Sequence, residues 1–233
     1  YKFSTVLREF YIEFNSNERL KWRKFKISLN CVTAGDTIKF KKRMMTDTPT
    51  SILISYSKVL SNALVKVYEN GPKKHKTLKI DLTGLKGLTH EQLINSNQYS
   101  ELVQKFNTLK DPCVYWFEIL GNYDIDTVWN AFQAFKDSHT HKLPRSKTKA
   151  PRDTNILYLG KVKFNLLRRM KEHLGFTTAT KTQSLQLCHW ATELGLEIEI
   201  NVLEFEQETS NLVGAFEFKL AREMKTILGS HTT

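Results

Sequence analysis

The chain contains few of the residues that build disulfide frameworks or membrane anchors. Of its 233 residues only three are cysteine, and Cys31, Cys113 and Cys188 lie far apart. Their number and spacing exclude a fully paired disulfide framework and the usual CxxC-type zinc sites. No apolar run reaches the ~20 residues of a membrane-spanning helix, and no secretory signal is visible. We therefore expect an intracellular, cytoplasmic protein with no membrane partner.

Acidic residues are scarce relative to basic ones. The chain has 35 lysine and arginine residues against 24 aspartate and glutamate residues, which gives a formal net charge of +11. A globular protein with this balance usually binds a polyanion, most often nucleic acid, although basic proteins without such a partner also exist. Hydrophobic residues make up 40% of the chain, so a real core can be buried.

The first part of the chain mixes aromatic and basic side chains without a clean helical or strand period. In the segment LKWRKFK, residues 20–26, lysine and arginine alternate with Trp22 and Phe25. Two interpretations stay open: a strip that contacts phosphates and stacks on bases, or an amphipathic strand with a solvated basic face. A second basic segment, TIKFKKRMM, follows at residues 37–45.

Turn and break signals organise the chain up to residue 112. A helix or strand is expected to end at the NGP turn of residues 70–72, and a strand to run through Leu78 to Leu82. A helix is expected to begin at Thr89. The Asp111–Pro112 step then breaks the chain. We place a domain boundary near residue 110, so that residues 1–110 form a region that contacts DNA or dimerises.

Residues 111–233 give clearer signals. Strands are expected at 113–120, which is apolar and rich in β-branched and aromatic residues, and at 156–160 and 197–206. Helices are expected at 126–139, 164–175, 184–196 and 210–229. The segment 139–155 carries many basic residues and two prolines, which predicts an exposed loop. The helix and loop together form an insertion at residues 122–154.

The stretch LYLGKVKFNLLRRMKEHLG, residues 157–175, places polar groups beside an apolar stripe. At about 100° per residue the stripe of the helix faces the core; it consists of Leu166, Leu167, Met170 and Leu174. Arg169 and His173 are four residues apart and share one flank of this stripe. We expect them to project together from the margin of the core. Arg168 falls on the solvent side, as a surface charge or a phosphate contact.

The last helix has the same organisation. Its apolar stripe consists of Val213, Phe216, Leu220, Met224 and Ile227. Glu217 lies at the edge of the stripe. Two interpretations are open for this carboxylate: a metal ligand, or an ion pair with a nearby lysine or arginine.

These motifs, in this order, resemble the GIY-YIG nuclease superfamily. The segment CVY at 113–115 occupies the place of the family's GIY signature. The segment YLG at 158–160, followed by Lys161, occupies the place of its YIG signature. NLLRRMKEH resembles the family's NLxxRxxxH helix, and FEFKLAREM resembles its ExxLI helix. The likeness covers roughly residues 112–231. It implies an α+β fold: a small three-stranded mixed or antiparallel sheet flanked by helices, here with an N-terminal mixed α/β extension.

The resemblance also implies a metal-dependent hydrolysis of phosphodiester bonds. Arg169 would hold the scissile phosphate, and Glu217 would bind one Mg²⁺ or Mn²⁺ ion per site. Tyr115 or Tyr158 would orient or deprotonate the attacking water, with its pKa lowered by the charge of Lys161. His173 would hydrogen-bond a tyrosine or the phosphate. Both tyrosines could instead be core residues.

Within the superfamily the chain looks most like the restriction-endonuclease branch. This implies a prokaryotic enzyme that cuts double-stranded DNA at a specific sequence, and a homodimer, because a two-fold site needs two active sites. DNA contacts are then expected from the basic loop and from the arginine helix; they are Lys142, Arg145, Lys147, Lys149, Arg152 and Arg168.

Two alternatives remain. Cys113 replaces the first glycine of the GIY signature, and the late asparagine of the family is missing from the terminal LGSHTT, where Ser230 or His231 could take its place. These departures favour a DNA-binding or repair protein that keeps the fold without catalysis. A nuclease for branched DNA or RNA fits the sequence equally well.

Overall fold

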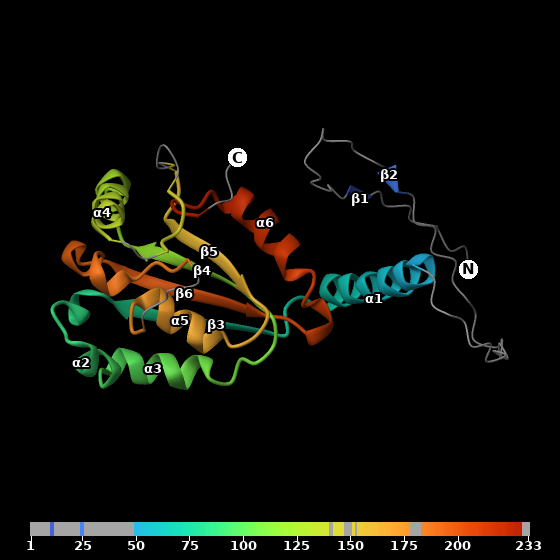
Figure 1. Ribbon diagram of the computed structural model, residues 1–233, viewed down its shortest axis with the longest axis horizontal. Coiled ribbons are helices and arrows are strands. Elements are labelled where there is room, and N and C mark those ends of the chain that lie inside the picture. The colour runs from blue at the N-terminus through green and yellow to red at the C-terminus, as the bar shows by residue number, and fades with distance from the viewer. Residues whose placement is uncertain are drawn as a thin grey trace. The chain divides into compact units, whose positions relative to one another are not determined.

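The structure is a computed structural model of the chain, shown in Figure 1. It describes residues 10–11, 24–25, 49–139, 142–146, 151, 153–177 and 183–229. The chain divides into two compact units, residues 1–46 and residues 47–233. In the first unit, β1 (Phe10–Tyr11) pairs antiparallel with β2 (Lys24–Phe25). The side chains of both basic segments in the first part of the chain lie outside the described residues.

The second unit is built on one antiparallel sheet with strand order β3-β6-β4-β5. Its strands are β3 (Lys74–Asp81), β4 (Cys113–Leu120), β5 (Ile156–Val162) and β6 (Glu197–Glu204). The α+β class is confirmed, but the sheet has four strands where the resemblance implied three. The added strand is β3, which pairs with β6 along its whole length.

The pairing of β3 explains this difference. The strand through Leu78 was expected from the sequence, but it was assigned to a separate N-terminal region. In the structure Ile80 is buried and belongs to the same core as β4 and β6. The boundary expected near residue 110 therefore falls inside the compact unit, which begins at Asp47.

Six α-helices lie in the described residues of the second unit: α1 (Pro49–Asn70), α2 (His90–Ile94), α3 (Asn97–Phe106), α4 (Ile125–Ser138), α5 (Leu166–Leu174) and α6 (Val213–Met224). Thr89 begins α2 as expected, through a capping box with Gln92. Gly175 ends α5 in the left-handed conformation that glycine adopts without strain.

Two expected helix ranges differ from the structure. Residues 184–196 form two short 3-10 turns, η2 (Leu187–His189) and η3 (Thr192–Leu194), in place of one helix. Gln186 and Gly195, just before and just after these turns, have left-handed backbones that a continuous helix excludes. The last helix stops at Met224, because Lys225 turns left-handed before the expected end at Gly229.

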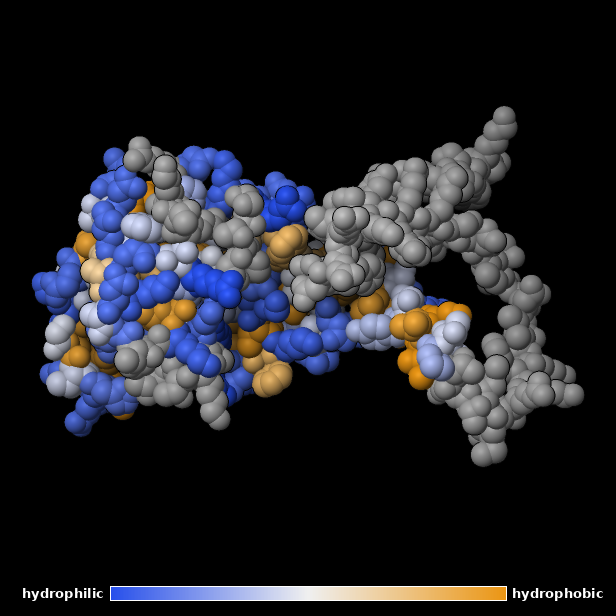
Figure 2. Space-filling model, turned by 45° about the horizontal axis from the view of Figure 1, so that its top comes forward, coloured by the Kyte–Doolittle hydropathy of each residue, from blue (hydrophilic) through white to orange (hydrophobic). Residues whose placement is uncertain are grey.

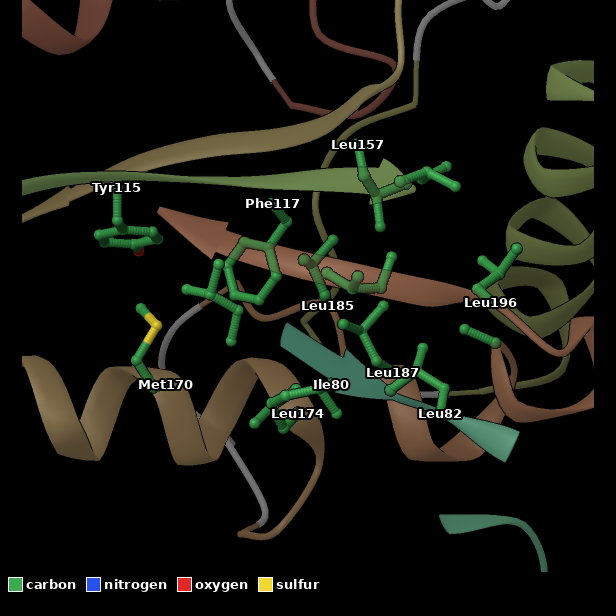
Figure 3. Close-up of a cluster of buried hydrophobic side chains, with 14 of the residues drawn as sticks. Ile80, Leu82, Tyr115, Phe117, Leu157, Met170, Leu174, Leu185, Leu187 and Leu196 are labelled. Atoms are coloured by element: carbon green, nitrogen blue, oxygen red, sulfur yellow. The ribbon is translucent and has the colours of Figure 1, made fainter. Parts of the chain in front are cut away.

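The sheet separates two apolar layers. Tyr115 and Phe117 point from β4 toward α5, where Met170 and Leu174 point back at them (Figure 3). On the opposite face of β4, Val114 packs in a smaller cluster with residues of α6. The strand alternates between the two layers because successive side chains point to opposite faces. This alternation decides which face each residue of the candidate site occupies.

Helix α1 differs from the others because little of it is buried. Only Ala63 is buried, and Val67 packs against the smaller apolar cluster. Ile52, Tyr56 and Val59 share the face of Ala63 at helical spacing, yet they are exposed. Figure 2 shows hydrophobic surface gathered at the N-terminal end of α1. Among the described helices, α1 included, none combines the length and apolar character that a membrane crossing requires.

Candidate active site

The antiparallel pair of β4 and β5 brings two phenol rings to one glycine. Tyr115 lies opposite Gly160, and Phe117 lies opposite Tyr158. A Cβ atom built on Gly160 would lie 2.6 Å from the Tyr115 Oη and 2.9 Å from Cε1 of Tyr158. Those distances are too short for any side chain. Gly160 is therefore the residue that allows both rings to sit against the strand.

The Tyr115 hydroxyl is the centre of a buried hydrogen-bond network. Tyr115 and His173 are both fully buried. The Oη of Tyr115 lies 3.0 Å from His173 Nε2 and accepts a hydrogen bond from Arg169 Nε at 3.1 Å. His173 Nδ1 accepts from the backbone N–H of Leu185 at 3.2 Å. This bond assigns the proton of the neutral ring to Nε2, so His173 also donates to Tyr115.

Three groups hold the guanidinium of Arg169. Its Nε donates to Tyr115, one terminal nitrogen donates to Glu172 Oε2 at 3.0 Å, and the other donates to the carbonyl oxygen of Gln183. The side chain is only 15% exposed. Glu172 also accepts from Arg168 Nε at 3.0 Å, although Arg168 is 68% exposed. The two adjacent arginines thus have different environments, as the helical spacing predicted.

Glu172 was missed in the sequence. It is 6% exposed, and a buried carboxylate needs charged or hydrogen-bonding partners. The signal was present: Glu172 lies three residues after Arg169 and four after Arg168, the spacings at which helical side chains meet. His173 is also deeper than expected, since it lies inside the core and not at its margin.

A second cluster lies on the other face of β5. The side chain of Lys161 lies on the face of β5 opposite to the side chain of Tyr158. Its Nζ lies 2.5 Å from Glu217 Oε2. Glu217 is buried on α6 and has only 10% of its side chain exposed, whereas Lys161 is 40% exposed. A Cβ at Gly214 would lie 3.4 Å from the same ammonium, so the lysine runs close along α6. The ion pair that the sequence left open for Glu217 is present.

The two clusters share an electrostatic field. Burial raises the pKa of Tyr115 and of Tyr158, and the charge of Glu217 raises both further. Arg169 lowers the pKa of both phenols, but by less than burial raises it. The cation acting on the tyrosines is thus Arg169, where the sequence suggested Lys161. Burial, followed by the charge of Arg169, lowers the pKa of His173 well below its usual 6.5, so its ring is neutral.

The described part of the basic loop, which includes residues 142–146, borders this site. The backbone carbonyl of Arg145 accepts from the N–H of Gly229 at 2.8 Å. A Cβ at Gly229 would in turn lie 3.8 Å from the Tyr158 ring. Lys142 and Arg145 are exposed. Three further loop residues that were expected to contact DNA lie outside the described residues: Lys147, Lys149 and Arg152. Ser230 and His231, near the end of the chain, also lie outside them.

No comparison supplies a name for this arrangement. No family model, curated protein or solved structure matches the chain. Its two clusters come from β4, β5, α5 and α6, and all six residues expected to act chemically belong to one or the other.

A metal ion fits this site only in a restricted way. Among the described residues, no group of three or more His, Cys, Asp or Glu side chains is arranged to hold a cation. Mg²⁺ keeps several waters and is commonly bound through one or two carboxylates together with substrate phosphates. Glu217 suits this mode as a single carboxylate. A cage made entirely of protein ligands does not fit.

Proposed function

We propose that the chain is a metal-dependent endonuclease that hydrolyses DNA phosphodiester bonds, of the GIY-YIG type and most like its restriction branch. The observation that carries the proposal is the largely buried guanidinium of Arg169, whose charge acts on both Tyr115 and Tyr158. Arg169 is held by three bonds with its charge retained beside two phenols. A fixed guanidinium is suited to a phosphate, because its planar fork matches two phosphate oxygens.

Arg169 has donors in excess of its structural bonds. A guanidinium carries five N–H groups; the bonds to Tyr115, Glu172 and Gln183 use three of them, and Tyr158 is placed to accept from a fourth. The orientation of the fork is set before substrate arrives, so the phosphate binds without reordering a flexible side chain. Such preorganisation is the main source of electrostatic stabilisation of a transition state.

The two tyrosines would have different roles. Tyr115 is fully buried and accepts from two donors, so it positions Arg169 and His173. Tyr158 is half-buried, so it is the less enclosed of the two tyrosines. We assign the orientation and deprotonation of the attacking water to Tyr158. Because burial raises its pKa in the free site, Arg169 has to supply the opposing stabilisation of a phenolate.

Glu217 would hold the cation, and Lys161 would lie beside the substrate. A divalent ion bound there would neutralise charge on the phosphate and on the leaving oxygen. Lys161 is the exposed member of the pair, so its flexible ammonium can move from the carboxylate toward a phosphate oxygen. The carboxylate oxygens of Glu217 would then ligate the cation, and the charge of Lys161 would face the phosphate.

We also propose double-stranded DNA as the substrate, a second copy of the chain as partner, and the cytoplasm as the compartment. The net charge of +11 favours a polyanion. The exposed stripe of Ile52, Tyr56 and Val59 on α1 suits a second copy. Within the 22 residues of this helix the only charged side chains are Lys58, Lys66 and Glu69, so two copies would repel each other little.

One observation favours a second candidate function, DNA binding without catalysis. Lys161 neutralises the single carboxylate that would hold the metal. If the ammonium stays there when DNA binds, the site recognises a phosphate and does not cut it. Such a protein would bind DNA with a strong salt dependence and without any metal requirement.

A plasmid-cleavage assay separates the two candidates. Supercoiled plasmid is incubated with the wild type and with Glu217→Ala, each with Mg²⁺, with Mn²⁺ and with EDTA. The nuclease proposal expects discrete fragments from the wild type with metal, and none from the variant or with EDTA. Intact plasmid that folded wild-type protein nevertheless binds would favour the binding function.

A further inference from the structure

A cleft of about 360 Å³ lies beside the start of α5. Three segments meet there: the end of α3, the turn before β4 and the connection between β5 and α5. The cleft is lined by Asn107, Leu109, Lys110, Phe164, Asn165 and Leu167. Its size falls within the range of about 300–1,000 Å³ that is typical of small-ligand sites.

The cleft has an apolar floor and an aromatic wall. Leu109 is 2% exposed and Leu167 is half-buried, so the floor is part of the folded core. Phe164 forms the wall with 74% of its surface exposed. A single exposed apolar side chain is ordinary on a protein surface. An exposed aromatic ring that lines a cleft together with buried leucines, however, offers a flat apolar partner a surface on which to stack.

The rim of the cleft is polar and cationic. Lys110 is exposed, and its Nζ lies 3.4 Å from Asn107 Oδ1, a long hydrogen bond. Asn165 uses its Oδ1 to accept from the backbone N–H of Arg168, and its amide group still carries two donor hydrogens. An aromatic wall, carboxamide edges and an ammonium are the groups that recognise a base plane, a base edge and a phosphate.

The connection that lines the cleft joins β5 to α5, the two elements that carry Lys161 and Arg169. Phe164 follows Lys161 by three residues and precedes Arg169 by five, so the chain that forms the wall also carries both cations. Lys163, on the same connection, is exposed and bonds Asn211.

We propose that the cleft binds one unpaired nucleobase of the substrate, stacked on Phe164, beside the phosphate held by Arg169. This inference rests on the proposed function and adds a substrate preference to it. A base inside a duplex is stacked on both faces and cannot enter the cleft, so the nucleotide has to be single-stranded, bulged or flipped. The protein should therefore bind a duplex with one unpaired base at this position more tightly than the same duplex fully paired.

Fluorescence anisotropy with short labelled oligonucleotides tests the inference in EDTA, where no cleavage occurs. The probes are a duplex with one unpaired adenine and the same duplex fully paired. Removing an aromatic platform costs about 1–3 kcal/mol per stacked base, which is about a 5- to 150-fold loss of affinity. Phe164→Ala should show this loss on the bulged probe and little loss on the paired one. Phe164→Trp should retain binding.

Two further variants complete the design. Phe218→Ala removes another exposed phenylalanine, 45% exposed on α6, and should leave the affinity for the bulged probe unchanged. Lys110→Ala should lower the slope of log affinity against log salt by about one, as expected for one lost phosphate contact. Circular dichroism and thermal melting check that each variant is folded.

The outcomes separate this inference from the function on which it rests. A wild type that cleaves DNA while Phe164→Ala binds and cuts like wild type would overturn the cleft alone. Equal losses for Phe164→Ala and Phe218→Ala, or equal losses on both probes, would overturn it too. A wild type that binds neither probe and cuts no DNA would overturn the proposed function together with the inference.

Discussion

Gly160→Ala tests the central packing feature of the site. The new Cβ would meet Tyr115 Oη at 2.6 Å, Tyr115 Cζ at 2.8 Å and Tyr158 Cε1 at 2.9 Å. Tyr115 cannot swing away freely, because it is fully buried and its hydroxyl is held by Arg169 and His173. Overpacking of this kind costs about 1–3 kcal/mol. Breaking a buried hydrogen bond at Oη adds about 1 kcal/mol or more.

We therefore expect Gly160→Ala to lower the free energy of unfolding by about 2–4 kcal/mol. Urea denaturation at neutral pH measures the change. Gly214→Ala is the matched control: its Cβ meets only the flexible end of Lys161 at 3.4 Å, and alanine favours the helix by up to about 1 kcal/mol over glycine. The control should be neutral or stabilising.

A double variant shows whether the contact itself is responsible. Tyr115→Phe removes the oxygen that the new methyl group would meet first. The double variant Gly160→Ala/Tyr115→Phe should therefore lose less stability than the two single variants added together. Ordinary surface substitutions change the free energy of unfolding by at most about 0.5 kcal/mol. If the free energy of unfolding of Gly160→Ala lies within that range of wild type, the close approach of the rings to Gly160 is refuted.

Three other predictions concern the pH response, the cation and the assembly. The folded chain keeps His173 neutral, whereas the unfolded chain protonates it below about pH 6.5. Because the unfolded chain then binds the additional proton, the free energy of unfolding falls by up to about 1.4 kcal/mol for each pH unit below that value. Urea titrations at several pH values should show His173→Gln losing this slope and His90→Gln, on the exposed surface, keeping it. Lys161→Met should tighten Mn²⁺ binding, measured by calorimetry without DNA, by up to about fivefold, the effect of removing a half-exposed ion-pair partner; unchanged affinity would mean that the ammonium does not compete with the cation. Ile52→Glu with Val59→Glu should shift the protein toward monomer in analytical ultracentrifugation, whereas Ser57→Glu should not, and equal shifts would exclude the α1 stripe as the interface.

Much of the site could be predicted from local sequence because its residues lie on regular elements. Arg169 and Arg168 were separated by helical geometry alone, and the structure gives them 15% and 68% side-chain exposure. Strands β4, β5 and β6 were predicted from apolar runs and alternation. In each case the periodicity of one segment was enough.

The features that were not predicted depend on contacts between distant segments. Strand β3 joins the sheet through pairing with β6, more than a hundred residues later, and no local pattern specifies that partner. The depth of His173 depends on the backbone of Leu185, which lies on an irregular segment. The cleft at Phe164 also has lining residues from separate parts of the chain, so its wall alone gave no signal.

Adjacent arginines allow the most direct test of the account. Arg169→Lys and Arg168→Lys each keep the charge and remove the planar fork, one at the buried position and one at the exposed position. In the plasmid assay with Mg²⁺ we predict that Arg169→Lys loses cleavage by at least about 100-fold, as expected when a preorganised donor at the transition state is lost. Arg168→Lys should cut within a fewfold of wild type. Equal cleavage by the two variants would contradict the assignment of Arg169 to the scissile phosphate.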